Sequence, residues 1–222
     1  MLVVEHVVKD YGNFVALDGV SMTVAPDAIT AMFGVNGAGK STLLRCCAGL
    51  SALTSGTVTV GGEHLPGSIE ARRLTSYIPD EPVLYDDLSV IEHLEFIARM
   101  HDVDDWEDRA DMLLERLGIN HRRDDLPVQF SRGLRQKTSL CIGLIRPFSL
   151  LMVDEPFVGL DAPGREALVG LLVESAEDGA CVLVSTHELG FAEVAHRCVV
   201  LGDGELVADG DLSQAAIATF IG

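Results

Sequence analysis

A glycine-rich loop between an apolar run and a helix-forming run constrains this chain more than any other feature. Residues 34–42 read Gly-Val-Asn-Gly-Ala-Gly-Lys-Ser-Thr; they follow the run Ile29 to Phe33 and precede the run Leu43 to Leu50. They fit the pattern G-x-x-x-x-G-K-[ST] at every position. Glycines let the backbone turn tightly around a polyphosphate, and successive amides at a helix start direct positive dipole toward it. A plain glycine turn would not require a lysine followed by two hydroxyls, so we expect this loop to bind a nucleotide.

The residue types in this loop predict which of them contact the phosphates and which contacts Mg²⁺. Lys40 supplies a mobile positive charge for the β- and γ-phosphates, and Ser41 is placed to ligate Mg²⁺. The other phosphate-binding candidates are Gly34, Asn36, Gly37, Ala38, Gly39 and Thr42.

The composition fits one domain, with room for a subdomain. The chain has 222 residues, of which 48% are hydrophobic, enough for one substantial core. The first twenty residues carry charges and lack a signal-peptide core, so we expect a cytoplasmic protein. No run approaches the roughly 18 apolar residues that a membrane helix needs, because Arg146 and Pro147 interrupt the most hydrophobic region. Any membrane association is therefore expected to run through a partner.

Charge and cysteine patterns exclude several kinds of site. The net charge is −18, and residues 86–125 hold 13 acids against 5 arginines, which disfavours nucleic acid. We interpret this segment as a solvated helix surface; a docking face for a basic partner is the alternative. The five cysteines lack C-x-x-C spacing and are expected to be buried free thiols. His187-Glu188 is followed by Phe191, so the second histidine of a zinc-peptidase motif is missing.

The pattern of apolar residues predicts an α/β core around a helical insertion. Ser89 and Asp104 are expected N-caps of two helices in the insertion, and Gly118 is expected to end the second. Two unbroken apolar runs after the insertion read as strands buried on both faces of a parallel sheet. The expected strands are 2–8, 20–24, 29–33, 57–60, 150–153 and 181–184, and the expected helices after the loop helix are 89–100, 104–117 and 163–177.

Two adjacent acids, Asp154 and Glu155, end the first of these buried strands, where ligands gather in open α/β sheets. Asp154 can hold Mg²⁺ through water, and Glu155 can accept a proton from an attacking water. The alternative, an acid pair that only faces solvent, is disfavoured by the phosphate loop earlier in the chain. His187 follows the second buried strand and is expected at the same sheet edge, within reach of the γ-phosphate.

Ser131 is predicted to cap the helix that leads to the acid pair. Followed by Gly133, it would leave backbone amides available for an anion. An ordinary capped helix is the alternative for this pattern taken alone.

These motifs together resemble the nucleotide-binding domain of an ATP-binding cassette (ABC) transporter, from end to end of the chain. Residues Phe130 to Leu134 resemble the Leu-Ser-Gly-Gly-Gln signature, residues 159–161 the D-loop that ends in Asp161, and residues 185–187 the histidine switch. Tyr11 stands where such domains carry an aromatic that stacks on adenine; a core or turn residue is the alternative.

Three residues depart from the family pattern. Asp80 stands where the Q-loop usually has glutamine, and we expect it to reach Mg²⁺ through water. In the signature, Arg132 replaces the first glycine and Leu134 replaces glutamine, while Ser131 and Gly133 are kept. The variants resemble those of single-cassette exporter ATPases.

The resemblance implies a P-loop NTPase (RecA-like) core with a mostly parallel sheet, an antiparallel β subdomain and a helical subdomain carrying the signature. The expected division is a core of about 1–85 and 147–222 and a helical subdomain of about 86–146. The implied cofactors are ATP and Mg²⁺, with Lys40, Glu155 and His187 as catalytic residues. The implied partners are a membrane-spanning permease and a second ABC ATPase subunit, in a homodimer that pairs each phosphate loop with the other chain's signature. The implied place is the inner face of the cell membrane, and the implied activity is ATP hydrolysis that powers export.

Other functions remain as alternatives. A soluble ABC ATPase acting on DNA or the ribosome would carry a coiled-coil insertion or two cassettes, and this sequence has neither. A P-loop kinase is disfavoured by the signature and the histidine, and a regulatory module without turnover by Glu155 and His187.

Overall fold

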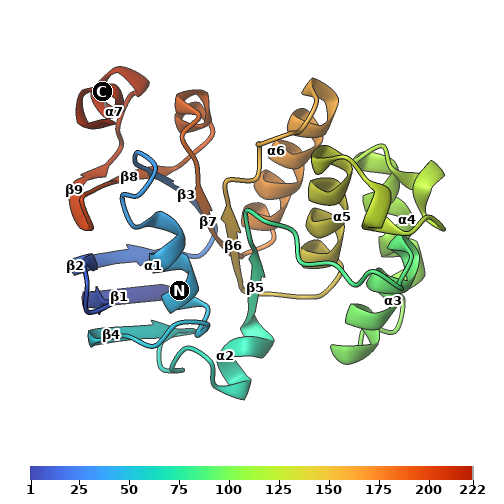
Figure 1. The fold of residues 1–222 in the computed structure, drawn as a ribbon, viewed down its shortest axis with the longest axis horizontal. Helices are drawn as coiled ribbons and strands as arrows, with labels where there is room; N and C mark the ends of the chain where they lie inside the picture. Colours follow the sequence, from blue (N-terminus) through green and yellow to red (C-terminus); the bar gives the residue numbers. More distant parts are fainter. Residues whose placement is uncertain (222) are drawn as a thin grey trace. The chain divides into compact units, whose positions relative to one another are not determined.

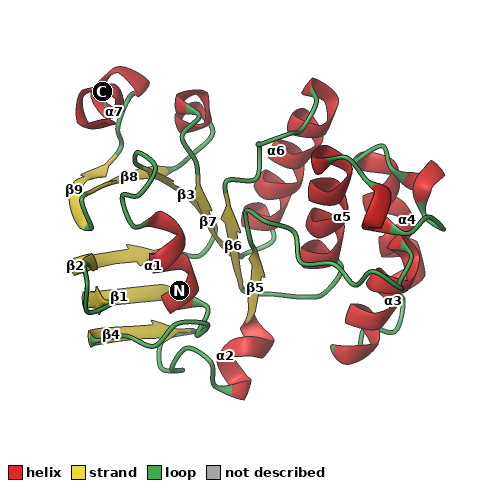
Figure 2. Cartoon of the chain, in the orientation of Figure 1, coloured by secondary structure: helices red, strands yellow, loops and turns green. Residues whose placement is uncertain are grey.

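The computed structural model describes residues 1–221, which form two compact units. The first unit comprises residues 1–77, 148–155 and 172–222, and the second comprises residues 78–147 and 156–171. Figures 1 and 2 show strands gathered in the first unit and helices in the second. The division predicted from the sequence differs mainly in placing 156–171 with the core, and it stays a prediction.

An antiparallel sheet in the order β2-β1-β4 forms one layer of the first unit. Its strands are β1 (Leu2–Asp10), β2 (Val15–Val24) and β4 (Ser55–Val60). They lie side by side in Figure 1 and alternate buried and exposed residues over much of their length, as expected for strands with one face on a core. The expected strands 2–8, 20–24 and 57–60 are confirmed, and each is longer than predicted.

The main sheet of the described residues runs in the order β5-β6-β7-β3-β8-β9. The pairs β6–β7, β7–β3 and β3–β8 are parallel, and β8–β9 is antiparallel. The two predicted buried strands, β6 and β7, are buried at every position. The bounds are β3 (Ala28–Phe33), β5 (Thr75–Ile78), β6 (Leu150–Asp154), β7 (Cys181–Ser185), β8 (Arg197–Gly202) and β9 (Glu205–Gly210).

Helix α1 (Lys40–Cys47) is the next element after β3, across the loop 34–39, and it packs on β6, β2 and β4. It begins three residues before the predicted start, because Lys40 and Ser41 belong to its first turn. The remaining helical elements of the first unit are α2 (Ile69–Leu74), the 3₁₀ helix η3 (Leu189–Glu193) and α7 (Gln214–Ile221).

The second unit is a group of helices in which α3, α4 and α5 contact one another. Ser89 caps α3 as predicted, through a capping box with Glu92. The predicted cap of α4 at Asp104 is wrong by one residue: the N-cap is Asp105, and it makes no side-chain cap bond. The helices are α3 (Val90–Met100), α4 (Trp106–Arg116), α5 (Arg132–Leu144) and α6 (Ala162–Glu177, which continues into the first unit), with 3₁₀ helices η1 (Asn120–Arg122) and η2 (Pro127–Gln129).

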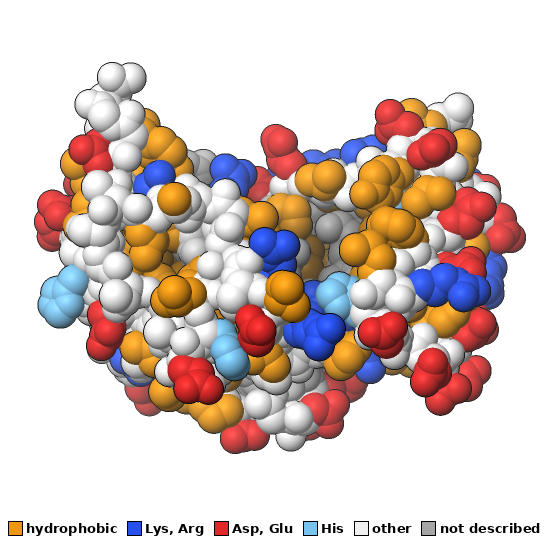
Figure 3. Space-filling model, turned by 90° about the horizontal axis from the view of Figure 1, so that it is seen from below, with side chains coloured by type: hydrophobic (Ala, Val, Ile, Leu, Met, Phe, Trp, Pro, Cys, Tyr) orange, Lys and Arg blue, Asp and Glu red, His pale blue; other side chains and the backbone are white. Residues whose placement is uncertain are grey.

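Surface charge and thiol burial agree with the sequence. The acids at positions 104, 105, 107 and 108 are exposed, and Figure 3 shows carboxylate side chains gathered at the right of the view, where α3 and α4 lie. All five cysteines are free and buried, and burial raises the pKa of the Cys46, Cys47 and Cys141 thiols. Within residues 1–221, no helix combines the length and apolarity needed to span a membrane.

Candidate functional site

The phosphate loop closes between β3 and α1 and is tied by its own lysine. The Lys40 ammonium donates to the carbonyl of Gly34 at 2.7 Å. Gly39 is the N-cap of α1 with φ of 104°, and no side chain caps the helix there. A Cβ on Gly34 would crowd the carbonyl oxygen of Leu201, and one on Gly39 would crowd that of Ala16. Glycine is therefore required by packing, and the first-turn amides of α1 remain uncapped by side chains, as an anion cradle requires.

A hairpin far along the sequence supports the loop from behind. The Gly204 amide, in the turn between β8 and β9, donates to the Ala38 carbonyl at 3.1 Å, and the Gly204 carbonyl accepts from the Asp18 amide at 2.9 Å. These bonds fix the loop to β2 and the hairpin. This role of Gly204 was not predicted from the sequence.

The acid pair is organised by a serine on the neighbouring strand. Asp154, 1% exposed, is the last residue of β6 and lies in register with Ser185 of β7. The Ser185 hydroxyl donates to Asp154 Oδ1 at 2.5 Å and accepts from the Glu155 amide at 3.1 Å. One hydroxyl thus fixes the orientation of both acids.

Glu155 lies between the phosphate-loop lysine and the predicted histidine. Its Oε1 is 3.2 Å from Lys40 Nζ, and its Oε2 is 2.8 Å from His187 Nδ1. Since an ionised carboxylate only accepts, Nδ1 carries the proton of this bond, and Nε2 points away from Glu155. The φ of Glu155 is 44°, a strained value for a residue with a side chain, and such strain concentrates at functional sites. The structure therefore brings Lys40, Glu155 and His187 together.

The donor set of the first unit fits Mg²⁺ bound with a nucleotide. No cluster of three or more His, Cys, Asp and Glu side chains suited to a metal occurs among residues 1–221, so a closed protein cage is absent from them. A hydroxyl at Ser41 and a buried carboxylate at Asp154 are hard oxygen donors. Mg²⁺ is commonly held by one or two such groups, with phosphate oxygens and water completing the octahedron.

Tyr11 lies in the turn between β1 and β2, as an exposed residue. Its ring stacks on Phe14 with centroids 5.3 Å apart, and Lys9 Nζ lies 4.7 Å from its centroid. The exposure of Tyr11 excludes a core residue, its place agrees with the turn alternative, and the exposed ring pair offers a stacking surface. Phe14, the stacking partner of Tyr11, was not singled out from the sequence.

In the second unit, Ser131 is the N-cap of α5, as predicted. Its hydroxyl accepts from the Leu134 amide at 3.3 Å. A Cβ on Gly133 would collide with the carbonyl oxygen of Gly159. The signature segment and the loop that resembles the D-loop are therefore packed together within this unit.

Asp161 is held to α5 by an ion pair. Its Oδ1 is 2.8 Å from Lys137 Nζ, and the hydrogen bond from Lys137 lowers the pKa of the Asp161 carboxyl. Lys137 was not singled out from the sequence, where it reads as an ordinary helix residue.

Asp80 also belongs to the second unit, where its Oδ1 lies 3.1 Å from Arg132 Nη2. Asp80 and Arg132, the two departures that introduce a charge, therefore form an ion pair with each other.

Comparison with known proteins agrees with this arrangement. A family model described as "ABC transporter" matches residues 17–158. The chain is 35% identical over 218 residues to the ABC-type transporter ATP-binding protein EcsA of Bacillus subtilis (strain 168), covering 96% of this chain and 88% of that protein. The chain belongs to the ABC transporter family.

Two further ABC proteins are similar along nearly the whole chain. The SkfA peptide export ATP-binding protein SkfE of Bacillus subtilis (strain 168) is 33% identical over 212 residues, covering 94% of this chain and 88% of that protein. A solved structure described as the ATP-binding subunit of an ABC transporter superposes with a TM-score of 0.89 at 32% identity, covering 95% of this chain and 89% of that one. The family and the fold class predicted from the sequence are confirmed: this is an ATP-binding subunit of a transporter with an ABC ATPase fold.

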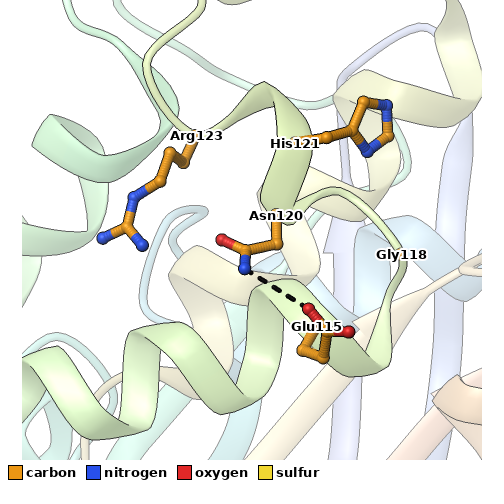
Figure 4. A pocket seen from close by; sticks show the side chains of 5 residues that line it. All are labelled: Glu115, Gly118, Asn120, His121 and Arg123. Atoms are coloured by element: carbon orange, nitrogen blue, oxygen red, sulfur yellow. Dashed lines mark hydrogen bonds between the residues drawn. The ribbon is translucent and has the colours of Figure 1, made fainter.

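The second unit of this ABC subunit also contains a pocket. It has a volume of about 470 Å³ and is lined by Glu115, Gly118, Asn120, His121 and Arg123. Figure 4 shows the Asn120 amide bonded to Glu115, with Arg123 extending from the same short segment. Arg123 also pairs with Asp111 at 2.8 Å. None of the predicted site residues lines this pocket, and we assign it no part in nucleotide binding.

Proposed function

We propose that this subunit hydrolyses ATP to power a membrane transporter, with export as the direction. The observation that carries the proposal is Glu155, held between Lys40 and His187 directly after a buried Asp154. A carboxylate so placed beside a phosphate loop suits a general base for water.

In the proposed site, the loop from Gly34 to Thr42 binds the phosphates through its amides, and Lys40 exchanges partners. A γ-phosphate competes with Glu155 Oε1 for the Lys40 ammonium, because phosphate carries more charge than a carboxylate. When Lys40 moves to phosphate, Glu155 becomes available for water while His187 keeps it oriented. His187 Nε2 then contacts the γ-phosphate.

Ser41 and Asp154 are the proposed Mg²⁺ ligands, and Mg²⁺ would neutralise charge on the β- and γ-phosphates. Asp80 remains a candidate for a contact through water. Tyr11 is proposed to stack on adenine, which its exposed ring pair with Phe14 supports.

The site is proposed to be completed by a second copy of the chain. Ser131 and Gly133, with Asp161 beside them, would meet the ATP held by the phosphate loop of the partner. The first-turn amides of α5 other than that of Leu134, which Ser131 caps, suit such a contact. An isolated copy is then expected to hydrolyse ATP slowly.

The proposed partner is a membrane-spanning permease, which would hold the dimer at the inner face of the cell membrane. The relative named as a peptide export ATP-binding protein supports the exporter direction. The rival function, action on DNA or the ribosome, is disfavoured by the net charge of −18.

Two substitutions test the nucleotide site. Glu155→Gln is expected to keep ATP affinity and lose about 10²-fold or more in turnover, the scale of a general base. Lys40→Ala is expected to weaken ATP binding, since the loop loses its point charge. Calorimetric titration of the chain with ATP measures affinity, and phosphate release by the complex with its copurified membrane partner measures turnover.

The matched control is Glu63→Gln, which removes an exposed carboxylate in a turn and should change neither quantity. Near-normal turnover by Glu155→Gln would remove Glu155 from the role of base. Stimulation of turnover by added DNA or ribosomes, but not by the membrane partner, would favour the rival.

A further inference from the structure

Two charged residues in this chain occupy positions where the ABC pattern has neutral ones, and they form an ion pair. Asp80 replaces glutamine and Arg132 replaces glycine, 52 residues apart in sequence. Their side chains meet at 3.1 Å, with Arg132 59% and Asp80 40% exposed. The negative charge that Asp80 would otherwise bring near phosphates is offset by Arg132, so the pair is as neutral as the pattern it replaces.

A second arginine holds the segment that begins at Asp80. We name this segment, residues 80–82, the strap. Arg135, three residues after Arg132 on α5, donates from Nη2 to the Pro82 carbonyl and from Nη1 to the Pro127 carbonyl, both at 3.3 Å. Residues three apart share a helix face. Arg132 and Arg135 therefore attach the strap to the first turn of α5 at both of its ends.

Stability alone does not account for the Asp80–Arg132 pair. Exposed ion pairs contribute little to folding, because water screens them and the side chains lose rotamer freedom. Their geometry, by contrast, fixes the position of what they join. Here the pair joins the strap to Arg132, which lies between Ser131 and Gly133 in the signature.

We propose that Arg132 is a positioning residue: through Asp80, it holds the signature segment 131–133 in the orientation that receives the partner's ATP. This inference rests on the proposed function, in which Ser131 and Gly133 contact that nucleotide. The Asp80 carboxylate is bound to Arg132, so any contact of Asp80 with Mg²⁺ must compete with this ion pair.

The test is a charge-exchange series in the Glu155→Gln chain, whose ATP-driven dimerisation is followed by analytical ultracentrifugation. Asp80→Gln or Arg132→Gln should each raise the ATP concentration for half-maximal dimerisation about 2- to 5-fold, the range that an exposed pair supports. Asp80→Arg or Arg132→Asp alone should raise it about tenfold, because each places like charges side by side. The double exchange, Asp80→Arg with Arg132→Asp, should return to within about twofold of the parent, since the pair is re-formed.

A second measurement tests the positioning itself without nucleotide. Hydrogen exchange in the peptide spanning 130–134 should quicken in each single charge reversal and return in the double exchange. If the parent chain does not dimerise with ATP, the proposed dimer fails, while hydrogen exchange still decides whether the pair positions the segment.

The matched control is the pair Arg123–Asp111, which is 2.8 Å apart with side chains 37% and 56% exposed. Reversing either of its charges should shift half-maximal dimerisation by less than about twofold. The proposal is overturned if the double exchange does not restore dimerisation, or if charge reversals in the control pair weaken dimerisation as much as those at Asp80 and Arg132. If the Asp80 variants weaken ATP-driven dimerisation while the Arg132 variants leave it unchanged, Asp80 is assigned to Mg²⁺ instead.

Discussion

Ser185 joins Asp154 and Glu155 at the scale of single atoms. Its hydroxyl uses its donor on the buried Asp154 carboxylate and its acceptor on the Glu155 amide. Burial of a carboxylate is costly unless hydrogen bonds compensate it. In our proposal, Asp154 holds Mg²⁺ and Glu155 activates water. Both therefore depend on Ser185, to which neither of these roles is assigned.

Ser185→Ala is expected to lower the free energy of unfolding by about 1–3 kcal/mol, because buried Asp154 loses a donor. It should also raise the Mg²⁺ concentration for half-maximal turnover, since Asp154 is no longer oriented. Urea denaturation and Mg²⁺ titration of the partner-bound ATPase measure these effects. Ser149→Ala, at an exposed position just before β6, is the control. An unchanged Mg²⁺ dependence would show that Ser185 acts on stability alone.

At this scale, the sequence predicted the residues with charge and missed those that orient them. Asp154, Glu155 and His187 were singled out from the sequence because acids and a histidine at strand ends are unusual, and their roles stay predictions. Ser185 was seen only as the first residue of a motif, because a serine at a strand end has many ordinary explanations. Its partnership with Asp154 depends on the pairing of β6 with β7, which no local pattern specifies.

At the scale of elements, the hairpin β8–β9 supports the phosphate loop through its turn. Asp203 and Gly204 have φ of 48° and 83°, as in the turns that favour Asp-Gly in two-residue hairpins. The close approach of Gly204 leaves no room for a side chain: a Cβ would lie 2.9 Å from the Ala16 carbonyl oxygen. The geometry of the phosphate loop is thus coupled to a turn far downstream by the bond from Gly204 to Ala38, which are 166 residues apart.

Gly204→Ala is expected to weaken ATP binding by about 5- to 30-fold, corresponding to about 1–2 kcal/mol of strain that displaces the loop. Calorimetric titration with ATP measures this loss. Gly62→Ala is the matched control, because Gly62 has a similar φ of 94° and open space around it; it shares the backbone strain without the crowding. Equal ATP affinity in the two variants would show that the hairpin does not position the loop.

Prediction of elements followed the strength of local signals. The two buried strands and the capped helix α3 were found because unbroken apolar runs and a Ser-x-x-Glu box are strong patterns. The strands β5, β8 and β9 and the helices α2 and α7 were not predicted. The Asp-Gly turn between two apolar-containing runs was a usable signal for β8 and β9. Strand β5 has four residues, too few for a periodic pattern, and it is defined by its place at the sheet edge.

At the scale of the whole molecule, the dominant property is a net charge of −18. Charge of one sign opposes the approach of a second copy, and this repulsion reaches further when salt is low. The proposed dimer must therefore form against a long-range repulsion that its nucleotide contacts overcome. Because the charge is read from composition, this property was fully available from the sequence, whereas the ion pairs that modify it locally were not.

Dimerisation of the Glu155→Gln chain with ATP is expected to strengthen as salt rises from about 0.02 M to about 0.15 M. The Debye length falls from about 20 Å to about 8 Å over this range, so the dissociation constant should fall about tenfold. Analytical ultracentrifugation at fixed Mg²⁺ and ATP measures it, with an uncharged osmolyte at equal osmolality as one control. The amide variant Asp104→Asn, Glu107→Gln and Asp108→Asn removes three exposed charges; its dimer should be tighter at low salt and respond less to added salt. A dimer that weakens steadily as salt rises would instead mean that complementary charges at the interface outweigh the net repulsion.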